Sequence, residues 1–178
     1  MQYAKNSKYN IRKAQPKEYP ILGRLIADVY AGIPGFPGPE VQPKYFKMLL
    51  DVGKRATNPA ISVFTAVNES GELLGSVDFI QDMQHYDSAS PAGKVADAAG
   101  IRLLAVSPAA RGMGIGKALT QYCIEQAQTL GRSKVCLHTT KSMQTAWGMY
   151  ERKGFVRFPE IDFKQGTLEI FGFNLNLN

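Results

Sequence analysis

Four stretches of the chain carry apolar residues every three or four positions, the interval that places them on one face of a helix. Pro16 suits the start of the first stretch, because proline is tolerated in the first helical turn. Gly131 and Gly154 follow the third and fourth stretches, and glycine often ends a helix. The pattern therefore predicts helices over residues 16–33, 41–53, 115–130 and 143–153.

Shorter apolar runs between turn residues predict the strands. The runs 61–67 and 73–80 flank the turn "NESGE" and are typical of an antiparallel hairpin. Prolines and glycines make 34–40 a loop, and a polar stretch follows the hairpin at 81–94. The other predicted strands are 10–14, 100–106, 134–138, 155–158 and 167–175.

The resulting order is β-α-α-β-β-β-α-β-α-β-β over a single domain, residues 1–178. Three strands follow one another directly, which favours a mixed, mostly antiparallel sheet over a doubly wound parallel one. The expected fold is of the α/β (α+β) class, with about seven strands and helices on both faces of the sheet.

Composition narrows the function classes. The net charge of +6 and the pI near 9.3 suit an anionic ligand. The basic residues are scattered, however, and the densest group (Lys141, Arg152 and Lys153) contains no run typical of a nucleic-acid arm. A solvated basic surface is therefore favoured, and no nucleic-acid partner is expected.

The two cysteines, Cys123 and Cys136, fall in apolar patterns and are expected to be free, buried thiols. They lack CxxC spacing, and His85 and His138 stand alone, so no metal is expected. Apolar runs are shorter than the 18–20 or so residues that span a bilayer, and the first ten residues are polar. These features predict a cytoplasmic protein with no membrane partner.

The segment "VSPAARGMGIGKAL" (106–119) places three glycines between a strand and a helix start. Glycine lets a backbone approach a ligand, and the first N–H groups of a helix attract anions, above all phosphate. A P-loop is excluded because Ala118 stands where a magnesium-binding hydroxyl is needed. A dinucleotide fingerprint is excluded because Lys117 stands where its third glycine is needed.

The same segment resembles the acyl-CoA signature of the GCN5-related N-acetyltransferase (GNAT) superfamily, roughly L-x-V-x-P-x-x-R-G-x-G-I-G-x-x-L. A second resemblance is "AWGMYERKGF" (146–155), similar to the family's A-x-x-x-Y-x-x-x-G-F segment. The residues in register are Leu104, Val106, Pro108, Arg111, Gly112, Gly114, Ile115, Gly116 and Leu119, then Ala146, Tyr150, Gly154 and Phe155.

The resemblance implies that coenzyme A, as acetyl-CoA, is the cosubstrate. The N–H groups of residues 112–117 would hold its pyrophosphate between Arg111 and Lys117, and the main chain of 104–106 would pair with its pantetheine arm. The implied cofactor-binding residues are Leu104, Ala105, Val106, Arg111, Gly112, Met113, Gly114, Ile115, Gly116 and Lys117.

Tyr150 is the candidate general acid, since a phenol of pKa about 10 can protonate a leaving thiolate whose thiol has a pKa of about 8.5. The alternative for this residue is a core tyrosine on an amphipathic helix. Where the family often has asparagine this chain has Met143, and Ser142 or Gln144 are the substitutes.

The sequence does not single out one residue as the general base. The position that carries a strand carboxylate in some relatives is Gly100, so Asp82, Asp97 or a water chain remain as alternatives. The segments 31–40 and 81–97 are expected to rim the acceptor pocket. Tyr30, Phe36 and Tyr86 are its candidate lining, with ordinary packing as the alternative for each.

The function that follows is transfer of an acetyl group from acetyl-CoA to a primary amine of a small molecule or peptide, in a ternary complex. The alternative is a non-catalytic acyl-CoA-binding module. The chain is expected to be a monomer or a homodimer, with "EIFGFNL" (169–175) as a possible pairing edge.

Overall fold

The computed structural model describes residues 8–87 and 89–177 and groups the chain into two compact units. The first unit contains Met1–Asp78 and Leu103–Tyr122, and the second contains Phe79–Arg102 and Cys123–Asn178. The boundaries fall inside regular elements, so both units are built from separate segments of the chain. The expectation of one domain over 1–178 stays a prediction.

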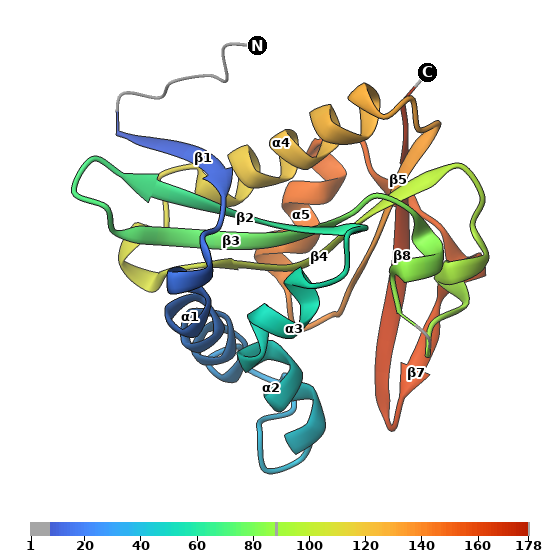
Figure 1. Cartoon of the computed structure of the whole chain (residues 1–178). Coiled ribbons are helices and arrows are strands. Elements are labelled where there is room, and N and C mark those ends of the chain that lie inside the picture. Colours follow the sequence, from blue (N-terminus) through green and yellow to red (C-terminus); the bar gives the residue numbers. More distant parts are fainter. Residues whose placement is uncertain (1–7, 88, 178) are drawn as a thin grey trace. The chain divides into compact units, whose positions relative to one another are not determined.

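The described residues form an eight-stranded sheet with helices (Figure 1). Its strands are hydrogen-bonded in the order β1-β2-β3-β4-β5-β8-β6, and β7 pairs with β8. The helices are α1 (Tyr19–Ala31), α2 (Pro43–Leu50), α3 (Val52–Ala56), α4 (Ile115–Thr129) and α5 (Gln144–Arg152). The strands are β1 (Tyr9–Lys13), β2 (Ile61–Asn68), β3 (Leu73–Ile80), β4 (Ala98–Val106), β5 (Lys134–Thr139), β6 (Val156–Arg157), β7 (Phe163–Gln165) and β8 (Leu168–Asn176).

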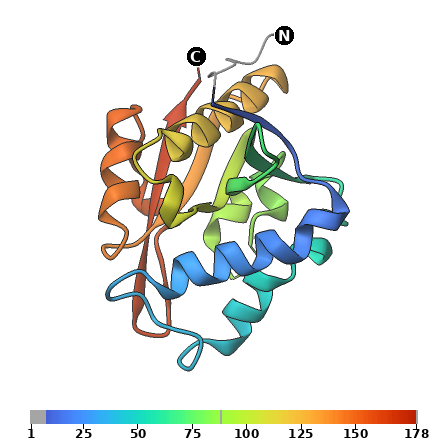
Figure 2. The ribbon, with the colours of Figure 1, turned by 90° about the vertical axis from the view of Figure 1, so that its left-hand side faces the viewer.

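In the first unit, β1 pairs antiparallel with β2, and α1 contacts both α2 and α3. Figure 2 shows α1 as one continuous coil with α2 beside it. Gly23 allows this close crossing, because a Cβ there would lie 2.2 Å from the carbonyl oxygen of Leu50. The helix buries Leu22 and Ile26 completely, which explains its apolar face.

The start of α4 packs on β3 and β4 in the same unit. A Cβ at Gly75 of β3 would lie 2.9 Å from the carbonyl oxygen of Ala105 and 3.0 Å from Ile115 Cγ2. Ile115 and Leu119 are buried there. The glycine therefore permits the contact that holds the end of β4 and the start of α4 together.

In the second unit, β5 pairs parallel with β4 and antiparallel with β8. β6 and β7 also pair antiparallel with β8. Trp147 of α5 packs edge-on against Phe171 and Phe173 of β8, with ring centroids 5.4 and 4.9 Å apart. These rings fasten α5 to the sheet.

The predicted fold class is confirmed: a mixed sheet, mostly antiparallel in its described ladders, with helices. The sequence did not predict β7, and it merged α2 and α3 into one helix over 41–53. The structure divides that helix at Asp51, which has φ −92° and ψ 64° and whose side chain caps α3.

Candidate functional site

The loop between β4 and α4 carries most of the residues predicted to bind a cofactor. Its first residue, Ser107, donates its N–H to Leu74 O of β3 at 2.9 Å. A 3-10 helix over Pro108–Ala110 follows, and Arg111 then leaves it in an extended conformation. The loop is thus anchored at its start by the sheet and at its end by buried Ile115.

Gly112 and Gly114 both have positive φ, +80° and +77°. A side chain rarely adopts this conformation, so glycine is needed whatever lies nearby. A Cβ at either position would meet nothing within 4 Å, and residues 111–114 are exposed. The backbone of the loop is therefore open on the side that a ligand would approach.

The helix that follows supplies N–H donors. Ala118 donates to Gly114 O at 3.0 Å as α4 begins. The N–H groups of residues 115–117, one turn earlier, have no intrahelical acceptor. Together with the helix dipole, they make the loop a physically suitable anion site. Exposed Lys117 lies in the same turn.

β4 changes conformation shortly before this loop. Its parallel ladder with β5 runs from Ala98 paired with Lys134 to Ile101 paired with Leu137. Leu103, two residues later, has φ +54°, a strained value for a residue with a side chain. In the residues that follow, Ala105 is buried, while Leu104 and Val106 are partly exposed.

Tyr150 lies on α5, in the second unit, whereas the loop residues lie in the first. Its side chain is buried and packs edge-on against Phe155, with ring centroids 5.6 Å apart. Burial raises the pKa of the phenol above its ordinary value, and nearby Cys123 raises it further. The hydroxyl is therefore protonated at all physiological pH values.

Met143, which stands in place of the family's asparagine, precedes α5 and donates its N–H to Thr140 O at 3.0 Å. Of the two substitutes considered, the Gln144 amide donates to Lys141 O at 2.5 Å. The hydroxyls of Thr139 and Thr140 are buried and have no hydrogen-bond partner among the described residues. Sequence reasoning did not single out these threonines, which read as ordinary strand residues.

Of the two residues considered as general bases, Asp82 stabilises a local helix, whereas Asp97 lies in an exposed turn. Asp82 caps the 3-10 helix Met83–His85 by accepting from Gln84 N at 3.0 Å, and it lies 3.5 Å from Arg132. Asp97 is exposed, with φ +52°, in the turn before β4. The bond from Gln84 N lowers the pKa of Asp82, which makes this carboxylate a weaker base.

The candidate acceptor-site aromatics fall into separate groups. Tyr30 and Phe36 of the first unit pack with Tyr45, with ring centroids 5.6 to 6.3 Å apart. Tyr86, in the second unit, is buried at 4% exposure and contacts Ile101 O and His138. Packing explains most of the surface of all four rings.

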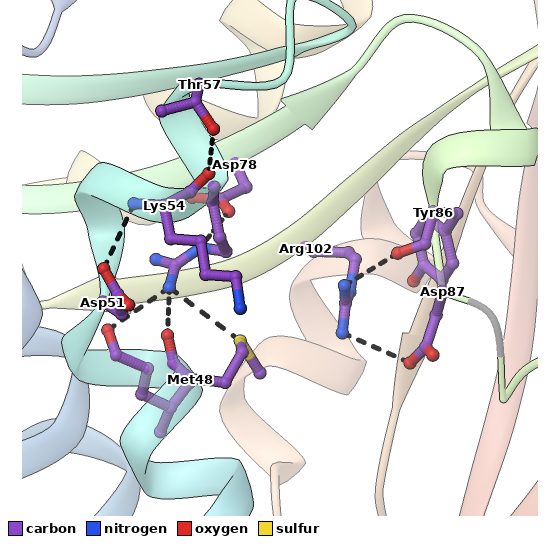
Figure 3. Close-up of polar contacts among 10 residues, drawn as sticks. Met48, Asp51, Lys54, Thr57, Asp78, Tyr86, Asp87 and Arg102 are labelled. Carbon is purple, nitrogen blue, oxygen red and sulfur yellow. Dashed lines mark hydrogen bonds and ion pairs between the residues drawn. The ribbon is translucent and has the colours of Figure 1, made fainter.

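A buried ion pair escaped the sequence prediction. Arg55 of α3 donates from Nε to Asp78 Oδ2 of β3 at 2.7 Å, and the side chains are 9% and 3% exposed. The guanidinium also donates to the carbonyl oxygens of Met48 and Leu49. Figure 3 shows Asp78 and Met48 in this network. An aspartate inside an apolar strand was the available signal.

No helix in the described part of the chain is long and apolar enough to cross a membrane. Among the same residues, no group of three or more His, Cys, Asp and Glu side chains is placed to hold a metal ion.

Comparison with known sequences identifies relatives. The sequence model of the Acetyltransferase (GNAT) family matches residues 27–155. A mycothiol acetyltransferase of Paenarthrobacter aurescens (strain TC1) is 35% identical over 104 residues, which cover 58% of this chain and 29% of that protein. The mycothiol acetyltransferase of Arthrobacter sp. (strain FB24) is 35% identical over 94 residues, covering 52% and 27%. The chain thus spans less than a third of the length of these curated relatives.

Solved structures share the fold at low sequence identity. A GNAT-family acetyltransferase of Staphylococcus aureus Mu50 superposes with a TM-score of 0.72 at 16% identity, covering 96% of this chain and 99% of that one. A spermidine N-acetyltransferase of Vibrio cholerae, in complex with CoA and spermine, superposes with a TM-score of 0.66 at 18% identity, covering 96% of both chains.

Proposed function

Since this chain belongs to the Acetyltransferase (GNAT) family, we propose that it is an enzyme that transfers an acetyl group from acetyl-CoA to a primary amine of a small molecule or peptide. The observation that carries the proposal is the loop before α4. Its two positive-φ glycines are exposed and lead directly into the free N–H groups of a helix.

In this proposal the N–H groups of residues 112–117 bind the pyrophosphate of coenzyme A. The open space outside Gly112 and Gly114 suits a close phosphate, because a side chain there would occupy it. Exposed Arg111 and Lys117 add positive charge on either side. The net charge of +6 acts in the same direction by attracting an anionic cosubstrate.

The main chain of Leu104, Ala105 and Val106 is proposed to pair with the pantetheine arm. These residues follow the positive φ of Leu103 and lie beyond the last paired residue of the β4–β5 ladder, Ile101. Backbone groups that a strand partner does not occupy are suited to an extended ligand.

Tyr150 is proposed to act as the general acid. Acetyl-CoA, when bound, supplies the acetyl group as a thioester. Tyr150 would then give its hydroxyl proton to the departing sulfur. Its raised pKa keeps the proton in place until that step, although it also widens the gap to a thiol pKa of about 8.5.

A second candidate is an acyl-CoA-binding module without turnover. It is favoured by the deep burial of Tyr150 and by Met143 at the position of the family's asparagine. This module would bind acyl-CoA through the same loop and would differ only in catalysing no transfer reaction. Rate measurements therefore separate the two candidates.

The acceptor is best sought among small amines. The reported relatives are named for mycothiol and one of the solved structures for spermidine, so the panel should contain polyamines, amino acids, aminoglycosides and peptide amines. Release of free CoA thiol from acetyl-CoA is the measurement. Turnover with any member supports the enzyme, and acetyl-CoA binding without turnover across the panel supports the binding module.

Replacing Tyr150 by Phe tests the acid. We expect kcat to fall about 100-fold or more, because general acid catalysis contributes at least this much, while the Kd for acetyl-CoA stays unchanged. Tyr9→Phe is the matched control, since Tyr9 is a buried tyrosine of β1. Unchanged kcat in Tyr150→Phe would assign this residue to the core only.

A further inference from the structure

Tyr86 lies directly against the backbone of β4 in the second unit. A Cβ at Gly100 would be 2.5 Å from Tyr86 Cδ2, 2.9 Å from its Cε2 and 2.9 Å from Met83 Sδ. The absence of a side chain at Gly100 therefore makes room for the phenol ring. The ring stands where a side chain of β4 would otherwise project.

The Tyr86 hydroxyl meets a histidine. Tyr86 Oη lies 3.1 Å from His138 Nδ1 of β5 and 3.4 Å from Ile101 O. On the other side of the imidazole, His138 Nε2 lies 2.7 Å from Ile161 O. A carbonyl oxygen only accepts, so Nε2 carries the hydrogen, and in the neutral ring Nδ1 accepts from the tyrosine hydroxyl.

The surrounding groups keep both side chains neutral. Burial lowers the pKa of His138, the bond to Ile161 O raises it, Arg102 lowers it, and Asp162 and Asp87 raise it, with a net lowering. Burial raises the pKa of Tyr86 above its ordinary value. Cys136, on the strand that carries His138, is a neutral thiol because burial raises its pKa to about 12.

Arg102 fixes the tyrosine from the β4 side. It donates from Nη1 to Tyr86 O at 2.7 Å and from Nη2 to Asp87 at 3.3 Å, as Figure 3 shows. Its guanidinium carbon lies 5.2 Å from the centre of the Tyr86 ring.

We propose that Tyr86 and His138 form the proton acceptor of the transfer reaction, an inference that rests on the proposed function above. An acceptor amine arrives as an ammonium ion and must lose a proton before it can attack. Tyr86 Oη takes that proton, directly or through one water, while its own proton passes to His138 Nδ1. One N–H bond breaks, one O–H bond is replaced, and one N–H bond forms on the imidazole.

Charge balances in this step, because the positive charge moves from the ammonium to an imidazolium. Both nitrogens then donate, Nδ1 to Tyr86 Oη and Nε2 to Ile161 O. The proton returns to solvent by the reverse route after transfer. Tyr86 touches the amine or its water, whereas His138 acts through Tyr86 as a positioning and proton-storing residue.

The alternative is that the pair only ties structure together. It links the segment after the 3-10 helix Met83–His85, strand β5 and the residues before β7, and Phe163 packs edge-on against the imidazole at 5.1 Å. A purely structural pair would affect stability, but it would leave the pH dependence of the rate unchanged.

The test compares His138→Gln and Tyr86→Phe with the wild-type enzyme, using one amine substrate and saturating acetyl-CoA. Because the substrate is the same, its own titration cancels in the comparison. We expect kcat to fall about 100-fold in each variant. We also expect the loss of rate towards low pH that reflects protonation of His138 to disappear from the pH–rate profile. Tyr86→Phe keeps the ring that packs on Gly100, and His85→Gln is the matched histidine control.

Wild-type kcat and an unchanged profile in both variants would overturn the proposal, as would an equal loss of rate at every pH with the decline towards low pH retained. Nitrogen-15 NMR of the two histidines gives a readout independent of turnover. We expect His138 as the neutral Nε2–H tautomer at neutral pH, and an Nδ1–H tautomer or a cation would also overturn the proposal. Absence of turnover by the wild type with every amine would overturn the proposed function and this inference together.

Discussion

Glycine meets two different physical needs in this chain. At Gly112 and Gly114 the backbone has positive φ, while a Cβ would meet nothing within 4 Å. At Gly75 and Gly100 the need is steric, because a Cβ would lie 2.9 Å from Ala105 O and 2.5 Å from the Tyr86 ring. The first pair leaves a surface open to a ligand, and the second allows parts of the protein to approach each other closely.

The open glycines give a prediction with an internal control. Gly112→Ala and Gly114→Ala should each lower the free energy of unfolding by about 1 kcal/mol, because an L-residue resists positive φ. They should also raise the Kd for acetyl-CoA about tenfold, since displaced N–H groups lose a charge-assisted hydrogen bond worth about 1.5 kcal/mol. Calorimetric titration and urea unfolding measure the two effects.

Gly131→Ala is the control, because Gly131 has φ +71°, has nothing within 4 Å of its Cβ position and lies just beyond the opposite end of α4. It should lose the same stability and retain the wild-type Kd. Equal weakening of acetyl-CoA binding in all three variants would contradict the loop as the phosphate site.

At the scale of the elements, α3 is held to β3 by charge as well as by apolar packing. Arg55 and Asp78 pair at 2.7 Å with almost no exposure, and Val52 of α3 is also buried. Removing one partner of a buried pair leaves the other charge without compensation in a medium of low polarity. This single contact therefore matters more than its one hydrogen bond suggests.

We expect Asp78→Asn and Arg55→Met each to lower the free energy of unfolding by about 3 kcal/mol, and the double variant to lose less than the sum. Glu169→Gln is the control, because its pair with Lys141 is 4.0 Å long and largely exposed and should be worth less than about 1 kcal/mol. Urea unfolding measures all four. Additive losses in the double variant would show that the pair is not coupled.

The sequence predicts elements well where the pattern is local and long. The strand predicted at 73–80 has these same bounds in the structure, and Gly131 ends α4 as expected. β7 was missed because three residues are too few to show a period. The division at Asp51 carried a local signal, an N-cap aspartate that bonds to Lys54 N, but the apolar spacing runs on through it.

At the candidate site, contacts between residues far apart in the sequence could not be predicted from the sequence. The glycine loop was predictable because all of its residues are neighbours in sequence. The pairs Arg55–Asp78 and Tyr86–His138 are 23 and 52 residues apart, and no spacing rule connects them. Tyr86 was considered as pocket lining and His138 as a lone histidine, and only the fold brings them to 3.1 Å.

At the scale of the whole molecule, the two compact units are interleaved along the chain. Their boundaries fall at Asp78 in β3, at Arg102 in β4 and at Tyr122 in α4, each within a regular element. Titrating groups are present in both, Glu18 in the first and Asp162 and His138 in the second. Stability as a function of pH is therefore a property of the entire chain.

Glu18, Asp162 and His138 show the direction of that dependence, and Asp82, whose pKa is also lowered, acts in the same direction. Hydrogen bonding from Arg12 lowers the pKa of Glu18. Partial burial opposes the charge on Asp162, but bonds from Arg157 and Gly172 outweigh it and lower its pKa as well. The pKa of His138 is lowered mainly by burial. For all four, the unfolded chain binds protons more readily, so stability falls as the pH falls.

The histidine and the carboxylates should lower the stability at different pH values. The contribution of His138 to the free energy of unfolding should be fully present above a pH of about 6.5, the ordinary histidine pKa. It should decline below that pH, because the unfolded chain takes up a proton that folded His138 does not bind as readily. A further decline should begin near a pH of about 4, where unfolded carboxylates protonate. In His138→Gln the first decline should be absent while the second remains, and His85→Gln should retain the first. Urea unfolding at a series of pH values measures this, and a wild-type curve that shows no decline between pH values of about 6.5 and 4 would contradict a lowered pKa of His138 in the folded protein.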